Sequence, residues 1–290
     1  MKKLLLLTLA IVTLTSEGYS QKFRFKKNYY WKTDNLRGKV KSFTESTYGA
    51  EDRFGEIQKT NLIQKKTYKY DDNVNLIESY NYKTDGLWSK NIFKYDDNGN
   101  LIEKNSFYGG VLTNSIIYKY DDSGNLIEEN SFGTHVFIDS TIFKYDDNGN
   151  LIEQYNYNAD GYGLGSKNIY KYDDNVNLME IYIYNADGRL GSKDIYKYDD
   201  NVNLIESYNY SADGKLSTKF GKGIFKYDDK DNKIEEKYCN ADGSLIYKDT
   251  FKYEFDEKGN WIKRITFYKE KELEEEWSRS IEEREYEYYE

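Results

Sequence analysis

A short pattern recurs eight times along most of this chain, and it constrains the fold more than any other feature. The pattern is Lys-Tyr followed by an acidic residue, and successive copies lie 25 to 29 residues apart. Its tyrosines are Tyr70, Tyr95, Tyr120, Tyr145, Tyr172, Tyr198, Tyr227 and Tyr253. A fixed period of this length indicates an array in which one supersecondary unit is repeated and neighbouring units bury each other's apolar surface.

Each copy contains two strand-like runs and two turns. One copy reads FKYDDNGNLIE from Phe93 to Glu103. Its opening aspartate, Asp96, can accept backbone N–H bonds as an Asx-turn, while Gly99 can adopt positive φ without steric cost. These residues predict a three-residue hairpin loop closed by a bulged glycine. The second turn, Asn-Ala-Asp-Gly at 185–188, repeats this logic, so both loops join antiparallel neighbours.

Some copies have another residue in place of the turn glycine. The position of Gly99 is taken by Val74, Val176, Val202 or Asp231 in other copies. Because valine is disfavoured at positive φ, we expect a neighbouring asparagine such as Asn75 or Asn177 to take the left-handed conformation there, or the loop to be longer.

The loop register predicts which side chains share a face, because directly opposed residues lie on the same side of a sheet. It places Tyr95 opposite Leu101 and Tyr184 opposite Leu190. Stepping by two from these pairs gives one aromatic face. Its members are Phe93, Tyr95, Leu101, Phe107, Tyr182, Tyr184, Tyr196 and Tyr198. The opposite face is mixed, with Lys94, Ile102, Ile195, Lys197 and Ile205.

Eight copies of two strands give sixteen strands, more than the ~10 that open twisted sheets usually hold before they curl or split. We therefore predict an all-β fold: an antiparallel β-hairpin repeat array whose long meander curls into a spiral or open shell with the aromatic face inward. The repeats occupy residues 65–268, flanked by N-terminal cap strands over 21–64 and an acidic C-terminal cap strand over 269–290. Ten of the last 21 residues are glutamate, which suits an end strand that discourages edge-to-edge association.

The first twenty residues have the features of an export signal. Lys2 and Lys3 precede an apolar run from Leu4 to Leu14, and Gly18 to Ser20 offer small residues for cleavage after Ser20. The run is shorter than the ~20 residues of a membrane-spanning helix. We expect an exported protein with no transmembrane segment, located in the periplasm, at the cell surface or outside the cell.

The pattern aromatic-Lys-Tyr-Asp, two residues, then Gly-Asn-Leu, as in residues 118–126 and 143–151, resembles the YD repeat of the RHS family. The resemblance covers roughly residues 68–265. In that family such repeats form the strands of a large β-shell around a C-terminal toxin, and shorter secreted relatives in Bacteroidetes-like bacteria mostly have no assigned activity. This chain has no proline, so it lacks the family's Asp-Pro processing motif. The half-repeat with Tyr, Asn and Asp-Gly is also similar to variant MORN repeats.

Candidates for chemistry are few. Catalysis needs a nucleophile and an oriented base, and the chain has one histidine, His135, and one cysteine, Cys239. We interpret His135 as a solvated loop residue and Cys239 as a small filler on the aromatic face. Asp96, Asn98 and Asn100 offer oxygen ligands at alternate positions, but Leu101 stands where an EF-hand requires glycine. We predict no catalytic residues, no metal site and no cofactor, with calcium-stabilised turns as an alternative.

The overall charge and the tyrosines indicate the class of partner. A net charge of -9 repels nucleic acid. The 32 tyrosines offer amphipathic contact surface, so we predict a non-enzymatic binding or interaction scaffold at the cell envelope, with a protein or a polysaccharide as partner. The expected ligand-binding residues are Tyr95, Tyr182, Tyr184, Tyr196, Tyr198 and Tyr208. The alternative is a structural or protein-assembly element in which these tyrosines only fill the sheet.

Overall fold

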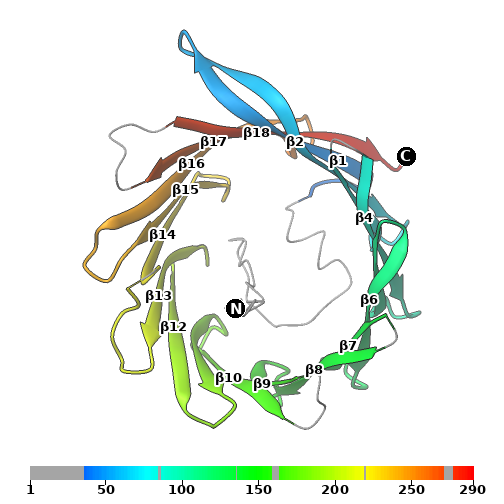
Figure 1. Cartoon of the computed structure of the whole chain (residues 1–290), viewed down its shortest axis with the longest axis vertical. Coiled ribbons are helices and arrows are strands. Elements are labelled where there is room, and N and C mark those ends of the chain that lie inside the picture. The colour runs from blue at the N-terminus through cyan, green and yellow to red at the C-terminus, as the bar shows by residue number, and fades with distance from the viewer. Residues whose placement is uncertain (1–35, 84–85, 135, 159–162, 219, 271–276) are drawn as a thin grey trace, which may run out of the picture.

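The computed structural model describes residues 36–290 except 84–85, 135, 159–162, 219 and 271–276. The expected export signal and His135 therefore lie outside the described residues. The described residues form one sheet of 18 antiparallel strands (Figure 1). The strands are β1 (Val40–Arg53), β2 (Glu56–Tyr70), β3 (Leu76–Lys83), β4 (Gly86–Tyr95), β5 (Leu101–Tyr108), β6 (Val111–Tyr120), β7 (Leu126–Gly133), β8 (Val136–Tyr145), β9 (Leu151–Tyr157), β10 (Leu164–Tyr172), β11 (Leu178–Asn185), β12 (Leu190–Tyr198), β13 (Leu204–Ser211), β14 (Lys222–Tyr227), β15 (Lys233–Cys239), β16 (Leu245–Phe255), β17 (Trp261–Glu270) and β18 (Trp277–Tyr288).

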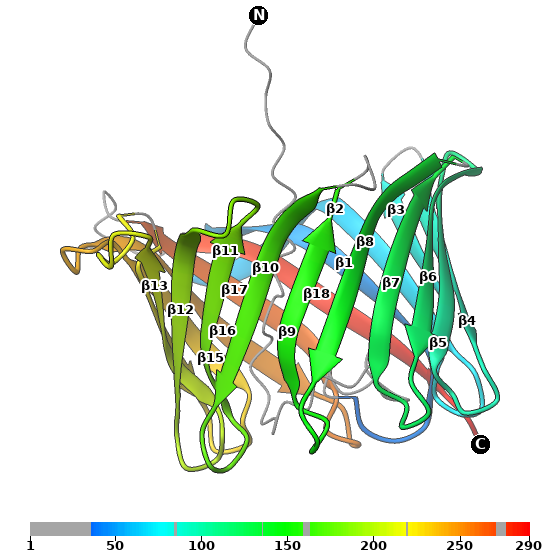
Figure 2. The ribbon, with the colours of Figure 1, turned by 90° about the horizontal axis from the view of Figure 1, so that it is seen from below.

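The sheet is closed. Each strand pairs with its sequence neighbours, and β18 also pairs with β1, from Val40 opposite Tyr288 to Gly49 opposite Ser280. The prediction of an open spiral or shell is therefore wrong, because the fold is an 18-stranded barrel (Figures 1 and 2). The physical reason is that both flanking segments form strands and satisfy each other's backbone groups, which removes the two edges that an open array would expose. The acidic strand β18 is thus a paired wall strand and not an edge.

The two kinds of loop lie at opposite ends of the barrel. In an antiparallel meander, alternate connections fall at the same end, so all Asp-containing first turns share one end, which we call the Asp-turn end. The second loops, such as the one at 185–188, share the other end, which we call the second-loop end. In Figure 2 the Asp-turn end is the lower edge.

The first turn has the predicted geometry. The N–H of Asp96 donates to the carbonyl of Asn100 and the N–H of Gly99 donates to the carbonyl of Asp96, both at 2.9 Å. Asp96 Oδ1 accepts the backbone N–H groups of Asn98 and Asn100 at 3.0 and 2.7 Å, which is the expected Asx-turn. The three-residue loop is confirmed.

The prediction for the valine-containing turns is wrong. Val74, Val176 and Val202 themselves adopt positive φ, at 66°, 68° and 67°, and Asp231 does so at 62°. The cause is the aspartate that opens the turn: Asp71 Oδ1 accepts the N–H groups of Asn73 and Asn75, as its equivalent does in the glycine copies. These bonds fix the same loop and force valine into the left-handed region, at an expected cost of ~1–2 kcal/mol per turn.

The register next to each loop is also as predicted, but the assignment of faces is only partly right. Tyr95 lies opposite Leu101 and Tyr184 opposite Leu190. However, Lys94 lies opposite Glu103, so Ile102 is an extra residue, a β-bulge. The bulge inverts the alternation beyond it, because a shift of one residue moves every following side chain to the other face. Phe107, Tyr182 and Tyr184 therefore lie on the outer wall, not with Tyr95.

From the second copy onward, the tyrosine of the Lys-Tyr pair ties its copy to the preceding one from the inner wall. The hydroxyl of Tyr95 donates to the carbonyl of Leu76 at 2.7 Å, and that of Tyr120 donates to the carbonyl of Leu101 at 2.8 Å. The same bond recurs from Tyr145, Tyr172, Tyr198 and Tyr227 to Leu126, Leu151, Leu178 and Leu204. Buried leucines of these copies pack between the rings. The repeated tyrosines are therefore structural along the inner wall.

The outer wall carries a belt of ion pairs. A lysine and a glutamate face each other across each Asp-turn hairpin at 2.8 to 3.9 Å. The pairs are Lys69–Glu78, Lys94–Glu103, Lys119–Glu128, Lys144–Glu153, Lys171–Glu180, Lys197–Glu206 and Lys226–Glu235. Their lysine side chains are about half exposed. This belt indicates that the outer wall is hydrated next to the Asp-turn end.

Candidate functional site

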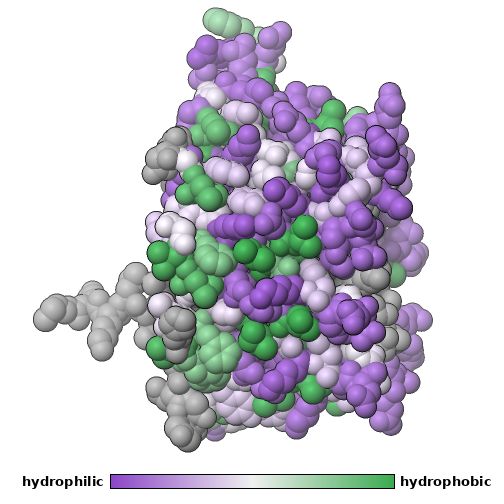
Figure 3. Space-filling model, turned by 90° about the vertical axis from the view of Figure 1, so that its right-hand side faces the viewer, coloured by the Kyte–Doolittle hydropathy of each residue, from purple (hydrophilic) through white to green (hydrophobic). Residues whose placement is uncertain are grey.

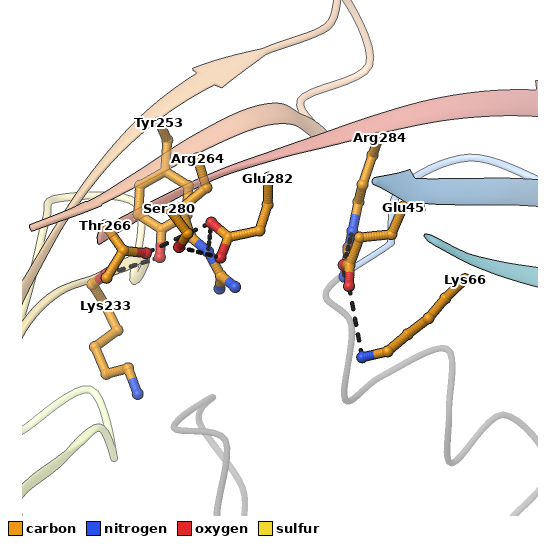
Figure 4. Close-up of polar contacts among 9 residues, drawn as sticks. All are labelled: Glu45, Lys66, Lys233, Tyr253, Arg264, Thr266, Ser280, Glu282 and Arg284. Atoms are coloured by element: carbon orange, nitrogen blue, oxygen red, sulfur yellow. Dashed lines mark hydrogen bonds and ion pairs between the residues drawn. The ribbon is translucent and has the colours of Figure 1, made fainter. Parts of the chain in front are cut away.

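The interior of an 18-stranded barrel is too wide for wall side chains alone to fill it. On most strands the inner wall near the Asp-turn end is lined by the repeated tyrosines and leucines. Around the junction of β18 and β1, several charged side chains extend from the inner wall into the barrel (Figure 4). We call this region the seam wall; its residues are Glu45, Lys66, Tyr253, Trp261, Arg264, Thr266, Ser280, Glu282 and Arg284.

One half of the seam wall is an ion pair between the first and last strands. Arg284 lies directly opposite Glu45, and its Nε and Nη2 both lie 2.9 Å from Glu45 Oε2. Lys66, opposite Glu45 on the other side, has its Nζ 3.9 Å from Oε1. Burial acts to raise the pKa of Glu45, but the charges of Arg284 and Lys66 outweigh it and the pKa is lowered. Glu45 is therefore a carboxylate held between two cations.

The other half is centred on Glu282. Its carboxylate lies 3.3 Å from Arg264 Nε and accepts hydrogen bonds from the hydroxyls of Ser280, at 2.8 Å, and Thr266, at 3.5 Å. Arg264 also faces Tyr253, whose hydroxyl donates to the carbonyl of Lys233 at 2.9 Å. Each nearly buried charge in this half thus has a partner, as buried charges require.

A tryptophan links the two halves. The Arg284 guanidinium lies 3.9 Å from the ring centroid of Trp261, and the Arg264 guanidinium lies 5.1 Å from it. Cation–π contacts of this kind favour a fixed arginine geometry. The seam wall therefore presents two pre-oriented guanidinium groups on one aromatic ring.

A row of aromatic rings crosses β15 to β18 near the second-loop end. Tyr238 and Tyr247 stack with centroids 4.9 Å apart, and Tyr247 and Tyr268 stack at 6.1 Å. Trp277, half exposed at 50%, meets Tyr268 edge-on at 5.6 Å. We call these four residues the aromatic ladder; each strand contributes one ring.

A carboxylic acid with a perturbed pKa lies beside the ladder. Asp249 is two residues from Tyr247 on β16, is only 7% exposed, and has Oδ2 3.6 Å from Arg279 Nη1. Burial, and then the charge of Glu236 directly opposite, raise the pKa of Asp249 to about 6. The ladder and this acid–arginine pair together combine flat apolar surface with a few polar groups, the usual make-up of a ligand site.

The six tyrosines expected to bind ligand do not form one site. Tyr95, Tyr196 and Tyr198 lie on the inner wall, whereas Tyr182, Tyr184 and Tyr208 lie on the outer wall. The hydroxyl of Tyr198 is engaged by the carbonyl of Leu178 at 2.9 Å. The structure does not bring these residues together.

The outer tyrosines have a role of their own. The ring of Tyr182 lies between Lys171 and Lys193, with Nζ atoms 4.6 and 4.8 Å from its centroid, and its hydroxyl donates to Glu180 at 2.8 Å. Tyr208 repeats this arrangement with Lys197, Lys222 and Glu206. These tyrosines reinforce the belt of ion pairs.

The sequence contained a signal for the seam wall and the ladder that the repeat pattern masked. Glu282 and Arg284 lie after residue 268, where the repeat pattern ends, whereas Arg264 stands at a position that carries serine, lysine, glutamate, glutamine or isoleucine in earlier copies. Departure from the repeat marked the unusual wall.

Cys239 is buried, but it lies opposite Lys222 on the outer wall, so the expectation of a filler on the aromatic face is wrong. The bulge again moves the side chain to the other face.

Both carboxylate oxygens of Asp96 already accept hydrogen bonds within the turn, and Oδ2 accepts from Asn100 Nδ2 at 2.9 Å. Among the described residues, no three His, Cys, Asp or Glu side chains gather as metal ligands. The same residues contain no helix long and apolar enough to cross a membrane.

Comparison with known proteins shows distant likeness. A family model described as an uncharacterised protein matches residues 57–136. No curated protein matches. Among solved structures, the chain is similar to one in the TcdB2-TccC3-Cdc42 complex, with 14% identity and a TM-score of 0.37 over 80% of this chain, and it spans only 12% of that chain.

Two further structures match along their whole length. A porin-like protein from Bacteroides uniformis has 11% identity and a TM-score of 0.46, covering 87% of this chain and 99% of that chain. A porin-like protein from Bacteroides vulgatus has 13% identity and a TM-score of 0.31, covering 86% and 98%. At these TM-scores the likenesses carry no argument about function.

Proposed function

We propose that this protein is an exported, non-enzymatic binding protein of the cell envelope, and that its ligand is a carbohydrate chain held inside the barrel on the aromatic ladder. The observation that carries the proposal is the ladder itself, where Tyr238, Tyr247, Tyr268 and Trp277 form a continuous row beside Asp249 and Arg279. Aromatic rings offer a flat apolar surface to sugar C–H groups, while carboxylates and guanidinium groups bond sugar hydroxyls.

Export to the cell envelope and a relation to YD-repeat proteins are part of the same proposal. The Lys-Lys start and apolar run favour export, and the repeated aromatic-Lys-Tyr-Asp pattern supports a relation to YD-repeat proteins. Because many repeat proteins act as scaffolds, a protein-assembly role is the second candidate. The hydrogen bonds from the hydroxyls of Tyr95 and Tyr120 to the carbonyls of preceding leucines favour the protein-assembly role, because they give the repeated tyrosines a structural function.

The test is binding of the purified protein to a panel of glycans and peptidoglycan fragments. Tyr268→Ala and Trp277→Ala remove the two outermost rings of the ladder. Tyr184→Ala is the matched control, because it removes a tyrosine from the outer wall near the same end. We expect saturable binding that each ladder variant weakens by roughly tenfold or more and the control leaves unchanged, as loss of a ~1.5 kcal/mol contact implies.

Two results would contradict the proposal. One is equal loss of binding in Tyr184→Ala, which would place the ligand elsewhere. The other is absence of binding to every glycan by a protein whose circular dichroism and melting curve are those of the native barrel. The second result would favour protein assembly. That role would then be identified by chemical crosslinking of the barrel to an envelope protein, if substitutions on the outer wall abolish the crosslink.

A further inference from the structure

The cations and the carboxylates of β6 to β13 are divided unequally between the two faces of the wall. All six lysines of these strands point outward, and each lies 2.6 to 3.9 Å from a glutamate of the same face. They are Lys119, Lys144, Lys167, Lys171, Lys193 and Lys197. Figure 3 shows part of the outer wall, on the side of β4 and β6, as a mixture of hydrophilic and hydrophobic residues. The outer glutamates of β6 to β13 therefore already have cationic partners.

The inner face of the same strands carries carboxylates without cations. They are Glu129 on β7, Asp139 on β8 and Asp194 on β12, and among the described residues of β6 to β13 no lysine or arginine shares their face. Asp194 accepts a hydrogen bond from Asn209 Nδ2 at 2.7 Å, which is a neutral donor. Burial raises the pKa of all three carboxyls, and the charge of Lys104 on β5 only partly offsets this effect on Glu129. This part of the inner wall is therefore short of positive charge.

The described chain starts on the inner side of the barrel. Leu36 is only 6% exposed and belongs to a core cluster with Phe43 of the inner wall. The backbone of Arg37 is fixed at the Asp-turn end, because its N–H donates to Asn260 Oδ1 at 2.5 Å and its carbonyl accepts from Asn260 Nδ2 at 2.8 Å. In Figure 1 the blue start of the described chain lies inside the ring of strands. The inner wall is therefore within direct reach of the residues that precede Leu36.

The sequence that precedes Leu36 complements this wall in charge and in apolar character. Residues 21–35 read QKFRFKKNYYWKTDN, with five lysines or arginines against one aspartate, so their net charge is +4. Five of these residues are aromatic: Phe23, Phe25, Tyr29, Tyr30 and Trp31. Fifteen extended residues span about 50 Å, more than the ~30 Å rise of a nine-residue strand such as β12. The segment is therefore long enough to reach any level of the inner wall from Leu36.

We propose that residues 21–35 dock inside the barrel, with their basic side chains against Glu129, Asp139 and Asp194 and their aromatic rings on the inner wall. The interior of an 18-stranded barrel has room for this segment, because wall side chains alone do not fill it. Carboxylates that are half-buried without a cation gain more from an incoming lysine than exposed ones, whose charge water and salt screen. This inference goes beyond carbohydrate binding and does not depend on it, since the aromatic ladder lies on β15 to β18.

The experiment is limited digestion of the folded chain, residues 21–290, with trypsin, followed by mass spectrometry. The basic residues of segment 21–35 are trypsin sites, and docking protects them in proportion to the docked fraction. The test variant neutralises the three inner carboxylates: Glu129→Gln, Asp139→Asn and Asp194→Asn. The matched control neutralises three exposed aspartates of the Asp turns: Asp97→Asn, Asp122→Asn and Asp147→Asn. Both variants lose the same three negative charges.

We expect slow cleavage of the segment in the native protein at low salt. The rate should rise roughly tenfold in the test variant and at high salt, and should stay unchanged in the control. A second variant, Lys26→Glu with Lys27→Glu, leaves the barrel wall intact and should accelerate cleavage at the remaining sites of the segment to a similar extent. Circular dichroism and thermal melting establish that each variant is folded.

Three results would overturn the proposal. The first is cleavage of the native segment as fast as that of a free peptide with the sequence of residues 21–35. The second is equal acceleration in the test variant and in the control, which would reflect net charge alone. The third is acceleration in the control only, which would place the segment on the outside of the Asp-turn end. If the test variant does not fold, unchanged protection in Lys26→Glu with Lys27→Glu would overturn the proposal by itself.

Discussion

Arg284 and Glu45 form an ion pair across the junction of the last strand and the first, although 239 residues separate them in the chain. Both side chains are nearly buried, at 7% and 12% exposure. Removal of either partner would leave a buried charge without compensation, the situation in which an ion pair matters most. Closure of the barrel therefore depends on the charged side chains of its first and last strands.

We expect Arg284→Leu to lower the free energy of unfolding by about 3 to 5 kcal/mol, because it leaves Glu45 buried and opposite only Lys66. Chemical denaturation measures the change. The double variant Arg284→Leu with Glu45→Leu should recover much of the loss, since it removes both charges. If the two single changes are simply additive, the pair does not act as a unit.

Substitution of Val202 by glycine should stabilise the protein by up to ~1 kcal/mol. Val202 has a φ of 67°, where glycine pays no steric cost, and relief of that strain exceeds the entropy that glycine adds to the unfolded chain. The reciprocal change Gly124→Val should destabilise by ~1–2 kcal/mol, because Gly124 has a φ of 77° although nothing lies within 4 Å of an added Cβ. Thermal melting of both variants checks the prediction, and destabilisation by Val202→Gly would contradict it.

Loss of one inter-repeat hydroxyl should cost about 1 kcal/mol. Tyr120→Phe removes the 2.8 Å bond to the carbonyl of Leu101 and leaves that carbonyl without this donor. Tyr184→Phe is the control, because its hydroxyl makes no hydrogen bond to any described residue. Equal melting temperatures for the two variants would show that the hydroxyl bonds do not hold the copies together.

Asp249→Asn should raise stability at neutral pH. The folded-state pKa of Asp249 is raised from 3.8 to about 6, so the folded protein binds this proton more tightly than the unfolded chain does. The protonated Asp249 therefore contributes to the free energy of unfolding, and this contribution is fully present below pH ~4 and is lost as pH rises through about 6. At pH 7 the variant should therefore gain about 1 to 3 kcal/mol, and the two proteins should converge below pH ~4. Parallel stability curves from pH 4 to 8 would contradict this assignment.

Local chemistry was sufficient to predict the hairpins. The Asp96–Asn100 turn and the pairing of Tyr95 with Leu101 follow from an aspartate that bonds the backbone of its own loop. The exception was Val74, where the same bonds overrode the steric preference of valine. In the candidate site, sequence alone identified tyrosines but not which of them share a wall, because the bulged residue after each Asp turn exchanges the two faces.

The sequence by itself determined an all-β array of antiparallel hairpins, since turn formation and strand alternation depend on residues within one copy. The tertiary structure alone decided that the array closes, that Tyr182 points outward while Tyr198 points inward, and that Arg264, Glu282 and Arg284 gather on one wall. The reason is distance along the chain: the register between β1 and β18 depends on the accumulated twist and bulges of all the strands between them, and no local pattern records that sum.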